Sequence, residues 1–362
     1  MVDQLKKIRN NYIKENIDFV DFWHGEVLFK LSPATIEIID NELKNTHYNY
    51  PSSTGNIRLI SALAKKYNVS ANNILVSNGI KTQLQLLIDA CFKEDDEVLL
   101  VTPIWSAYKD IFEIKGIKVH EYKLEEDFSI DLSKIIDLLR NNKIKYILLN
   151  NPNNPLGLIL PKSIIKELVE IAKKNEVMVI SDEVFSELVF NPDKKIKDSY
   201  SDENLIIFNS ASKSFGLPGF KLSYLVAPKY IIRSMGSYAA KFSMGVPDLI
   251  QLAFLNELND KQKHNKDISL IKEKFLFIKE IINKSKFLEL DVSEAGLTLF
   301  PRVKKEVSLD WALTLLEKHK VSIIPGSFYG YSDRFRMCYG HLSIKEIQKG
   351  LDEINSFLEE VN

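Results

Sequence analysis

The chain has 362 residues, of which 45% are hydrophobic, 10% aromatic and 27% charged. This balance is typical of folded globular proteins and excludes disordered and collagen-like chains, and the length predicts about two domains. The 48 Lys and Arg residues against 49 Asp and Glu residues leave a formal charge of -1. Because no positive excess favours nucleic acid or an anionic membrane, we expect neither as a partner.

Cysteine and histidine usage narrows the chemistry further. Cys91 and Cys338 are too few for a disulfide framework or a structural zinc site. The six histidines include no pair three or four residues apart, which disfavours metal catalysis. No segment approaches the ~18 consecutive apolar residues of a membrane span. The charged N-terminus also lacks the apolar stretch of a signal peptide. We therefore predict a protein of the reducing cytoplasm.

The middle of the chain reads as alternating strands and helices. A helix is predicted over 33–46, after Ser32-Pro33. Short β-branched runs then alternate with amphipathic helices between about residues 50 and 240. These runs lie at 73–77, 97–101, 117–122, 145–150, 177–181, 204–208 and 222–227. Near-continuous apolar strands separated by helices predict a buried, mostly parallel sheet with helices on both faces.

The C-terminal third has a different pattern. Longer helices are predicted at 247–262, 267–284 and 343–360, and short strands at 297–301, 322–324 and 334–339. Without strict alternation, this region predicts a smaller α+β domain. We expect three parts: an N-terminal segment 1–47 that joins the small domain, a large α/β domain 48–245, and the small domain 246–362.

Four polar or aromatic residues follow predicted strand ends, where ligand sites of open α/β sheets gather. They are Trp105, Asn154, Asp182 and Lys213. Each also has a purely structural interpretation: a packed tryptophan, an Asn-Pro turn, the cap of a helix beginning at Glu183, and a solvated lysine. No Walker-type or Gly-x-Gly-x-x-Gly loop supports a nucleotide site.

Together, the motifs around these residues resemble a known family. SNGIKTQLQLL, TPIWSAY, NNPNNPLG, SDEVF and SASKSFGLPGFKLSYLVAP occur in the order of the class I/II aminotransferases. DFWHGEVLFKLSP and YNYPSSTGNIRLISALA precede them, and PGSFYG and RFRMCYG follow, so the resemblance covers nearly the whole chain. In size the chain is most similar to the branch of histidinol-phosphate aminotransferase and threonine-phosphate decarboxylase. The resemblance implies fold type I, with a mostly parallel seven-stranded sheet in the large domain, and pyridoxal 5'-phosphate as cofactor.

The resemblance also implies roles for individual residues. Lys213 would hold the cofactor as a Schiff base and then carry the proton, which requires a lowered amine pKa. Asp182 would pair with the pyridine nitrogen and keep the ring an electron sink. Asn154 would bond the ring O3' and line the substrate pocket, and Trp105 would stack on the ring.

Further residues would hold the phosphate and the substrate. The phosphate group comprises Gly79, Ile80, Lys81, Ser210 and Lys221, with a helix N-terminus near Ile80. Tyr50 would reach the phosphate of a partner subunit, which implies a homodimer with a shared site. Arg336 would grip the substrate α-carboxylate with its planar fork, beside the backbone of His24 and Gly25.

Three positions depart from the family pattern. Phe185 replaces a tyrosine that bonds O3', Lys221 replaces a phosphate-clamping arginine, and Leu156 replaces a threonine. The residues favour an aminotransferase that exchanges an amino group between an amino acid and a 2-oxo acid. A pyridoxal-phosphate-dependent decarboxylase, lyase or oxidase is the alternative. A non-catalytic cofactor-binding protein is a second alternative, disfavoured because Lys213, Asp182 and Arg336 are all present.

Overall fold

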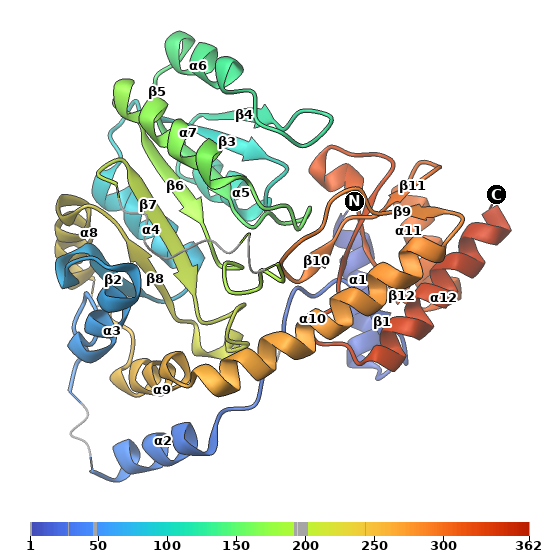
Figure 1. Ribbon diagram of the computed structural model, residues 1–362, viewed down its shortest axis with the longest axis horizontal. Helices are drawn as coiled ribbons and strands as arrows, with labels where there is room; N and C mark the ends of the chain where they lie inside the picture. Colours follow the sequence, from blue (N-terminus) through green and yellow to red (C-terminus); the bar gives the residue numbers. More distant parts are fainter. Residues whose placement is uncertain are drawn as a thin grey trace.

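The computed structural model describes residues 2–27, 29–45, 49–191, 194, 202–242 and 244–361. Figure 1 shows a large body built around one sheet and a smaller body that holds both chain ends. Helix α10 (Lys261–Lys284) runs from one body to the other. This is the expected α/β fold with a second, smaller α+β part.

The central sheet has seven strands in the order β2-β8-β7-β6-β5-β3-β4. Six of them run in the same direction, and β8 runs antiparallel to both of its neighbours, β2 and β7. The strands are β2 (Ile74–Ser77), β3 (Glu97–Thr102), β4 (Val119–Lys123), β5 (Ile144–Asn150), β6 (Met178–Asp182), β7 (Leu205–Ser210) and β8 (Ser223–Val226). The prediction of a seven-stranded, mostly parallel sheet is therefore confirmed.

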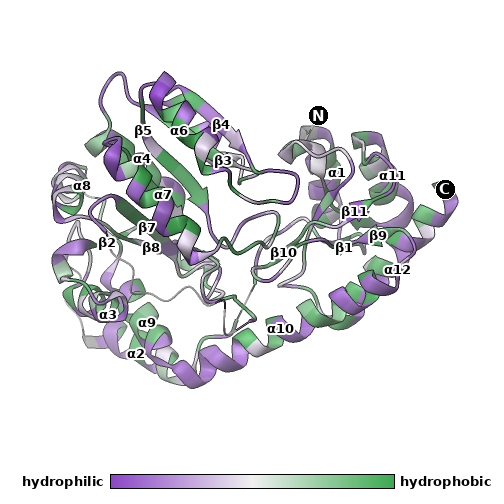
Figure 2. Cartoon of the chain, turned by 45° about the horizontal axis from the view of Figure 1, so that its top comes forward, coloured by the Kyte–Doolittle hydropathy of each residue, from purple (hydrophilic) through white to green (hydrophobic). Residues whose placement is uncertain are grey.

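Helices cover both faces of this sheet because successive strand side chains point to opposite sides. Ile147 and Val179 face one core, which α3, α6, α7 and α9 cover, whereas Leu148 and Ile180 face the core under α4, α5 and α8. Figure 2 shows hydrophobic residues along the central strands. The covering helices are α3 (Ile57–Tyr67), α4 (Ile80–Cys91), α5 (Ala107–Ile114), α6 (Leu132–Asn141), α7 (Lys162–Lys174), α8 (Lys229–Lys241) and α9 (Asp248–Asn259).

The smaller body has its own core between helices and short strands. Its helices, besides α10, are α1 (Val2–Lys14), α11 (Leu309–His319) and α12 (Ile344–Val361). Its strands are β1 (Val20–Asp21), β9 (Leu288–Glu289), β10 (Thr298–Leu299), β11 (Arg302–Val303), β12 (Val321–Ser322), β13 (Ile324–Pro325) and β14 (Phe335–Cys338). The sequence did not predict α1, in which only two of the described apolar side chains, Leu5 and Tyr12, are buried. The parallel pair β1–β12 joins the N-terminal segment to a strand of this body.

The predicted break between two helices, at residues 262–267, is wrong, because the observed break is at Asp260. Helix α9 ends at Asn259, and the Asp260 carboxylate accepts a hydrogen bond from the Lys263 backbone at 2.9 Å, which caps α10. Phe254 of α9 packs in the large core and Phe275 of α10 in the small one. We keep the three-part division of the chain as a proposal. The chain crosses from the large body to the smaller body within α10. The predicted boundary between residues 47 and 48 lies outside the described residues, as does the end of the helix predicted over 33–46, which is described as α2 (Pro33–Asn45).

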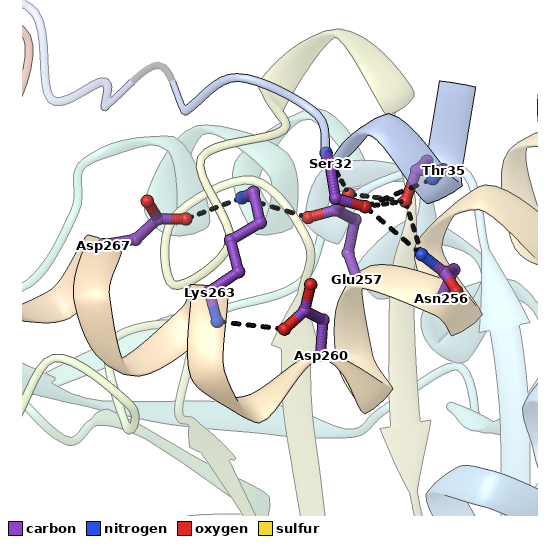
Figure 3. Close-up of polar contacts among 7 residues, drawn as sticks. All are labelled: Ser32, Thr35, Asn256, Glu257, Asp260, Lys263 and Asp267. Carbon is purple, nitrogen blue, oxygen red and sulfur yellow. Dashed lines mark hydrogen bonds and ion pairs between the residues drawn. The ribbon is translucent and has the colours of Figure 1, made fainter. Parts of the chain in front are cut away.

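A buried polar cluster joins the N-terminal segment to the α9–α10 junction (Figure 3). The Glu257 carboxylate, 3% exposed, accepts hydrogen bonds from the Ser32 backbone at 2.8 Å and the Thr35 hydroxyl at 2.5 Å. Lys263 pairs with both Glu257 and Asp267. This cluster fixes the start of α2 against the α9–α10 junction.

No helix of the described ranges is long and apolar enough to cross a bilayer.

Candidate active site

The strand register gathers the predicted residues at one edge of the sheet. Asn150 pairs with Asp182, and Asp182 pairs with Phe208, so the carboxyl ends of β5, β6 and β7 are level. Asp182 is the last residue of β6. Asn154 lies four residues after the end of β5, and Lys213 lies three residues after the end of β7. The expected clustering of these loops is therefore present.

A group of residues suited to an anion, here called the anion cradle, lies at the β2 side of the same edge and comprises Ser77, Ser223, Ser210 and the start of α4. Ser77, Ser223 and Ser210 are aligned across the neighbouring strands β2, β8 and β7. Gly79 caps α4 with a φ of +88°, and a Cβ there would come within 3.9 Å of the Lys221 carbonyl oxygen. The free amides at the start of α4, near Ile80, favour a phosphate.

Lys81 and Trp105 approach each other across this cradle. The Lys81 ammonium lies 5.1 Å from the centre of the Trp105 ring. Lys81 and Lys221 are both exposed, so either ammonium can meet an anion from the solvent side. Lys81 thus contacts the Trp105 ring, and the Lys221 backbone lies beside Gly79 at the start of α4.

Asp182 is a buried carboxylate with two donors. Its Oδ2 accepts a hydrogen bond from the Tyr108 hydroxyl at 2.6 Å, and its Oδ1 accepts one from the Val184 backbone at 3.2 Å. Burial raises the pKa of Asp182 to about 6, whereas the bond from Tyr108 and the charge of Lys213 act to lower it. No helix begins at Glu183, so that interpretation is wrong: the residues after Asp182 form a turn.

Lys213 and Arg336 converge on one glycine. The Lys213 ammonium donates to the Gly25 carbonyl, and a Cβ on Gly25 would lie 3.9 Å from both Lys213 Nζ and Arg336 Nη2. Burial lowers the pKa of Lys213. A deprotonated lysine amine is the form that attacks a carbonyl. The N-terminal segment therefore brings an amine and a guanidinium to the same point, with the exposed His24 next to it.

Arg336 is buried rather than on the surface, with 7% of its area exposed. Its Nη1 donates to the Tyr329 hydroxyl at 2.9 Å, and its Nη2 donates to the Trp23 carbonyl at 2.8 Å. Its Nε is buried without a partner. A buried guanidinium with a free donor is suited to an added carboxylate, since unpaired buried donors are costly.

The described residues fit pyridoxal phosphate. The Asn154 amide has a buried oxygen without a partner, and a half-turn of the amide would present its nitrogen there as a donor to a ring oxygen. The buried Asp182 carboxylate fits a protonated ring nitrogen, and the α4 cradle fits the phosphate. These groups lie at one sheet edge around Lys213, which is the donor set that the cofactor requires.

Two of the residues that depart from the family pattern, Phe185 and Leu156, are buried in hydrophobic cores. Phe185 belongs to the small-body core, and a Cβ on Gly296 would meet its ring at 3.8 Å. Leu156 is fully buried in the large core. Tyr50, in contrast, is 95% exposed and contributes nothing visible to the site of its own chain.

The sequence did not predict four participants near the site: Tyr108, Tyr329, Cys338 and the Trp23 carbonyl. Tyr108 lies in the first turn of α5, and its backbone amide donates to the carbonyl of Trp105, three residues earlier, at 3.2 Å. Cys338 stands two residues after Arg336 on β14, and such residues share a strand face; its thiol lies 3.0 Å from Arg336 Nη2. Strand periodicity could have found Cys338, whereas the bond from Tyr108 to Asp182 and the bond from Arg336 to Trp23 join positions 74 and 313 residues apart.

Comparisons with known proteins agree with this geometry. A family model described as aminotransferase class I and II matches residues 17–354. The aspartate aminotransferase of Thermotoga maritima is 27% identical over 96% of this chain and 93% of its own. The asparagine–oxo-acid transaminase of Streptococcus mutans is 25% identical over 81% of this chain and 78% of its own.

Solved structures show the same fold. A crystal structure of the Thermotoga maritima aspartate aminotransferase superposes with a TM-score of 0.90 at 24% identity, covering 98% of this chain and 96% of that one. The aromatic aminotransferase of Pyrococcus horikoshii superposes with a TM-score of 0.86 at 21% identity, covering 97% of this chain and 99% of that one.

Proposed function

The chain belongs to the class I and II aminotransferase family, and we propose how its residues carry out that family's reaction. It is a pyridoxal-phosphate-dependent aminotransferase, which moves an amino group between an amino acid and a 2-oxo acid. When bound, the cofactor carries the amino group and withdraws electrons from the substrate carbon.

The observation that carries our assignment of roles is the convergence of Lys213 and Arg336 on Gly25. Arg336 binds the substrate α-carboxylate, because its buried fork retains a free Nε donor. That carboxylate would place the substrate Cα beside Lys213, whose amine would hold the cofactor and, once free, move the Cα proton. Asp182 would pair with the ring nitrogen, Asn154 would donate to the ring oxygen, and Trp105 would cover the ring face.

We propose an acidic amino acid, aspartate first, as the amino donor. The support is the name shared by several relatives, including those of Thermotoga maritima and Bacillus subtilis. The finer placement beside histidinol-phosphate aminotransferase rests on chain length alone, and histidinol phosphate is therefore the second donor to test.

We also propose a homodimer with a shared active site. Five large apolar side chains are exposed on α2, before and within α3, and at the end of α8: Ile36, Leu43, Tyr50, Ile57 and Phe242. An interface between two subunits would remove these side chains from water. The Asn78 amide, in the phosphate loop, donates to the Met244 carbonyl at 3.2 Å, so the loop adjoins this surface. Tyr50 would then reach the partner's phosphate.

We keep the cytoplasm as the proposed location, with the free thiols of Cys91 and Cys338 as its support. Fractionation of cells that express a tagged chain tests this.

The central experiment follows amino transfer by the purified protein with pyridoxal phosphate. Aspartate or histidinol phosphate serves as donor and 2-oxoglutarate as acceptor, while carbon dioxide and ammonia are measured as products of the alternative reactions. Borohydride reduction and peptide mapping should place the cofactor on Lys213. Lys213→Ala should abolish this label and nearly all turnover, whereas Lys229→Ala, an exposed lysine of α8, should change neither. A label on another lysine contradicts the assignment.

A second experiment tests the shared site. Light scattering should give twice the chain mass, and Tyr50→Phe should weaken cofactor binding. Tyr230→Phe removes the hydroxyl of another exposed tyrosine, 58% exposed, and should leave binding unchanged. A fully active monomer would contradict the shared site.

A further inference from the structure

Tyr108 connects two walls of the proposed cofactor site. Its side chain is fully buried on α5, and its hydroxyl donates to Asp182 Oδ2 at 2.6 Å. The edge of its ring also meets Trp105, with ring centres 5.6 Å apart and an interplanar angle of 85°. One side chain thus touches both the aspartate and the aromatic residue that we place against the ring.

We propose that Tyr108 is a positioning residue that holds the Asp182 carboxylate, in its charged form, in place for the cofactor ring nitrogen. This inference rests on the proposed function. The hydroxyl occupies Oδ2 and the Val184 amide occupies Oδ1. With both oxygens fixed, the carboxylate plane cannot rotate, and its remaining lone pairs have one orientation.

The electrostatics of the site explain why such a donor is needed. Burial favours the neutral acid and raises the pKa of Asp182 to about 6. Only two ionisable side chains act on Asp182 in the described part of the chain: Tyr108 from α5, and Lys213 from the loop after β7. Lys213 changes its charge and place during the reaction. Tyr108 stays fixed, and its own pKa is raised well above the usual value by burial, so it remains a donor.

Substitutions separate the two contacts of Tyr108. Tyr108→Phe keeps the ring against Trp105 and removes only the hydroxyl, whereas Tyr108→Leu removes both. Tyr146→Phe is the matched control: Tyr146 is another buried tyrosine of the large body, and its hydroxyl bonds the Cys91 carbonyl at 3.3 Å, away from Asp182. Thermal unfolding establishes that each variant is folded.

The first readout uses the cofactor-free protein. Carbon NMR of labelled aspartate, with the Asp182 signal identified by its loss in Asp182→Asn, follows the carboxyl group from pH 4 to 9. A lost hydrogen bond to a charged group should move the midpoint upward by about one to two pH units in Tyr108→Phe. Tyr146→Phe should retain the parental midpoint. An unchanged midpoint in Tyr108→Phe overturns the proposal.

The second readout is the cofactor dissociation constant against pH. In Tyr108→Phe the acid limb of binding should move upward with the Asp182 midpoint, and in Tyr108→Leu binding should weaken at every pH because Trp105 is also released. If the midpoint moves and the acid limb does not, the link from Tyr108 to the cofactor is wrong. If Asp182→Asn itself binds cofactor like the parent, the role of Asp182 in the proposed function fails instead.

A third measurement needs no substitution at Tyr108. In the parent protein, the hydroxyl proton of Tyr108 should give a proton signal downfield of other tyrosine hydroxyls, which moves as Asp182 titrates. A signal that does not respond to that titration contradicts the proposal even where Tyr108→Phe fails to fold.

Discussion

Gly216→Ala is expected to loosen the loop that carries Lys213. Gly216 has a φ of +64°, and its amide donates to the Lys213 carbonyl at 3.3 Å. A Cβ at this position would lie 2.6 Å from Cδ2 of Phe29 and 2.8 Å from its backbone nitrogen. No real Cβ sits that close to a neighbour, so the loop or the N-terminal segment must move.

The expected cost has two parts. A side chain in the left-handed region costs roughly 1–2 kcal/mol. Overpacking against Phe29 adds about 1–3 kcal/mol, and because one of the two close atoms is backbone, rotation of the phenyl ring cannot relieve it. Gly116→Ala is the matched control, since Gly116 has a φ of +71° and nothing within 4 Å of its Cβ. Gly116→Ala should therefore lose only the roughly 1–2 kcal/mol that the left-handed backbone costs.

Urea unfolding followed by circular dichroism gives both free energies of unfolding. Gly216→Ala should lose more than Gly116→Ala, and it alone should weaken cofactor binding. Adding Phe29→Ala should restore part of the loss, because the phenyl ring then no longer obstructs the methyl group. Equal destabilisation by the two glycine substitutions would refute the packing argument.

Two other predictions concern charged groups. Burial acts to raise the pKa of Glu187, but its contacts with His264 and Lys66 lower it to about 2. Because folding lowers the pKa of Glu187, its contacts stabilise the folded protein fully at pH values above the unfolded pKa of 4.5. This contribution disappears as the pH falls toward the folded pKa of about 2. Glu187→Gln should therefore cost about 3 kcal/mol at pH 7 and little at pH 2, as measured by unfolding at both pH values. Lys221→Arg should tighten cofactor binding by about 1 kcal/mol, and Lys81→Ala should weaken it less in that background than in the parent. Dissociation constants for the four proteins should be non-additive, and strict additivity would show that the two lysines act separately.

The sequence predicted the parts of this molecule that local patterns encode. Apolar runs with period two or no period became the seven central strands, and the residues that follow their ends lie at one edge. Helix α1 was missed because few of its residues are apolar, and its amphipathic face becomes meaningful only against α11. Phe185 was read as a change at the cofactor, but it also packs in the small core.

Contacts between distant residues could not be predicted from local patterns. The bond from Tyr108 to Asp182 spans 74 positions, and nothing in either segment requires it. The place of Lys81 beside Trp105 likewise depends on how α4 and β3 are packed. Sequence motifs therefore predict which residues gather at the site. The contacts that each side chain makes can be known only from the three-dimensional structure.

The path of the N-terminal segment has a consequence for how the protein is made. Its bonds at the site join Gly25 with Lys213, 188 positions apart, and Trp23 with Arg336, 313 positions apart. Its bond at the α9–α10 junction joins Ser32 with Glu257, 225 positions apart. Contacts of such high sequence separation form late in folding, because loop closure must be completed first. The N-terminal segment can therefore dock only after the later parts of the chain that carry Lys213 and Arg336 are in place. Since both residues belong to the proposed site, we expect catalytic competence to be among the last properties that the folding chain gains.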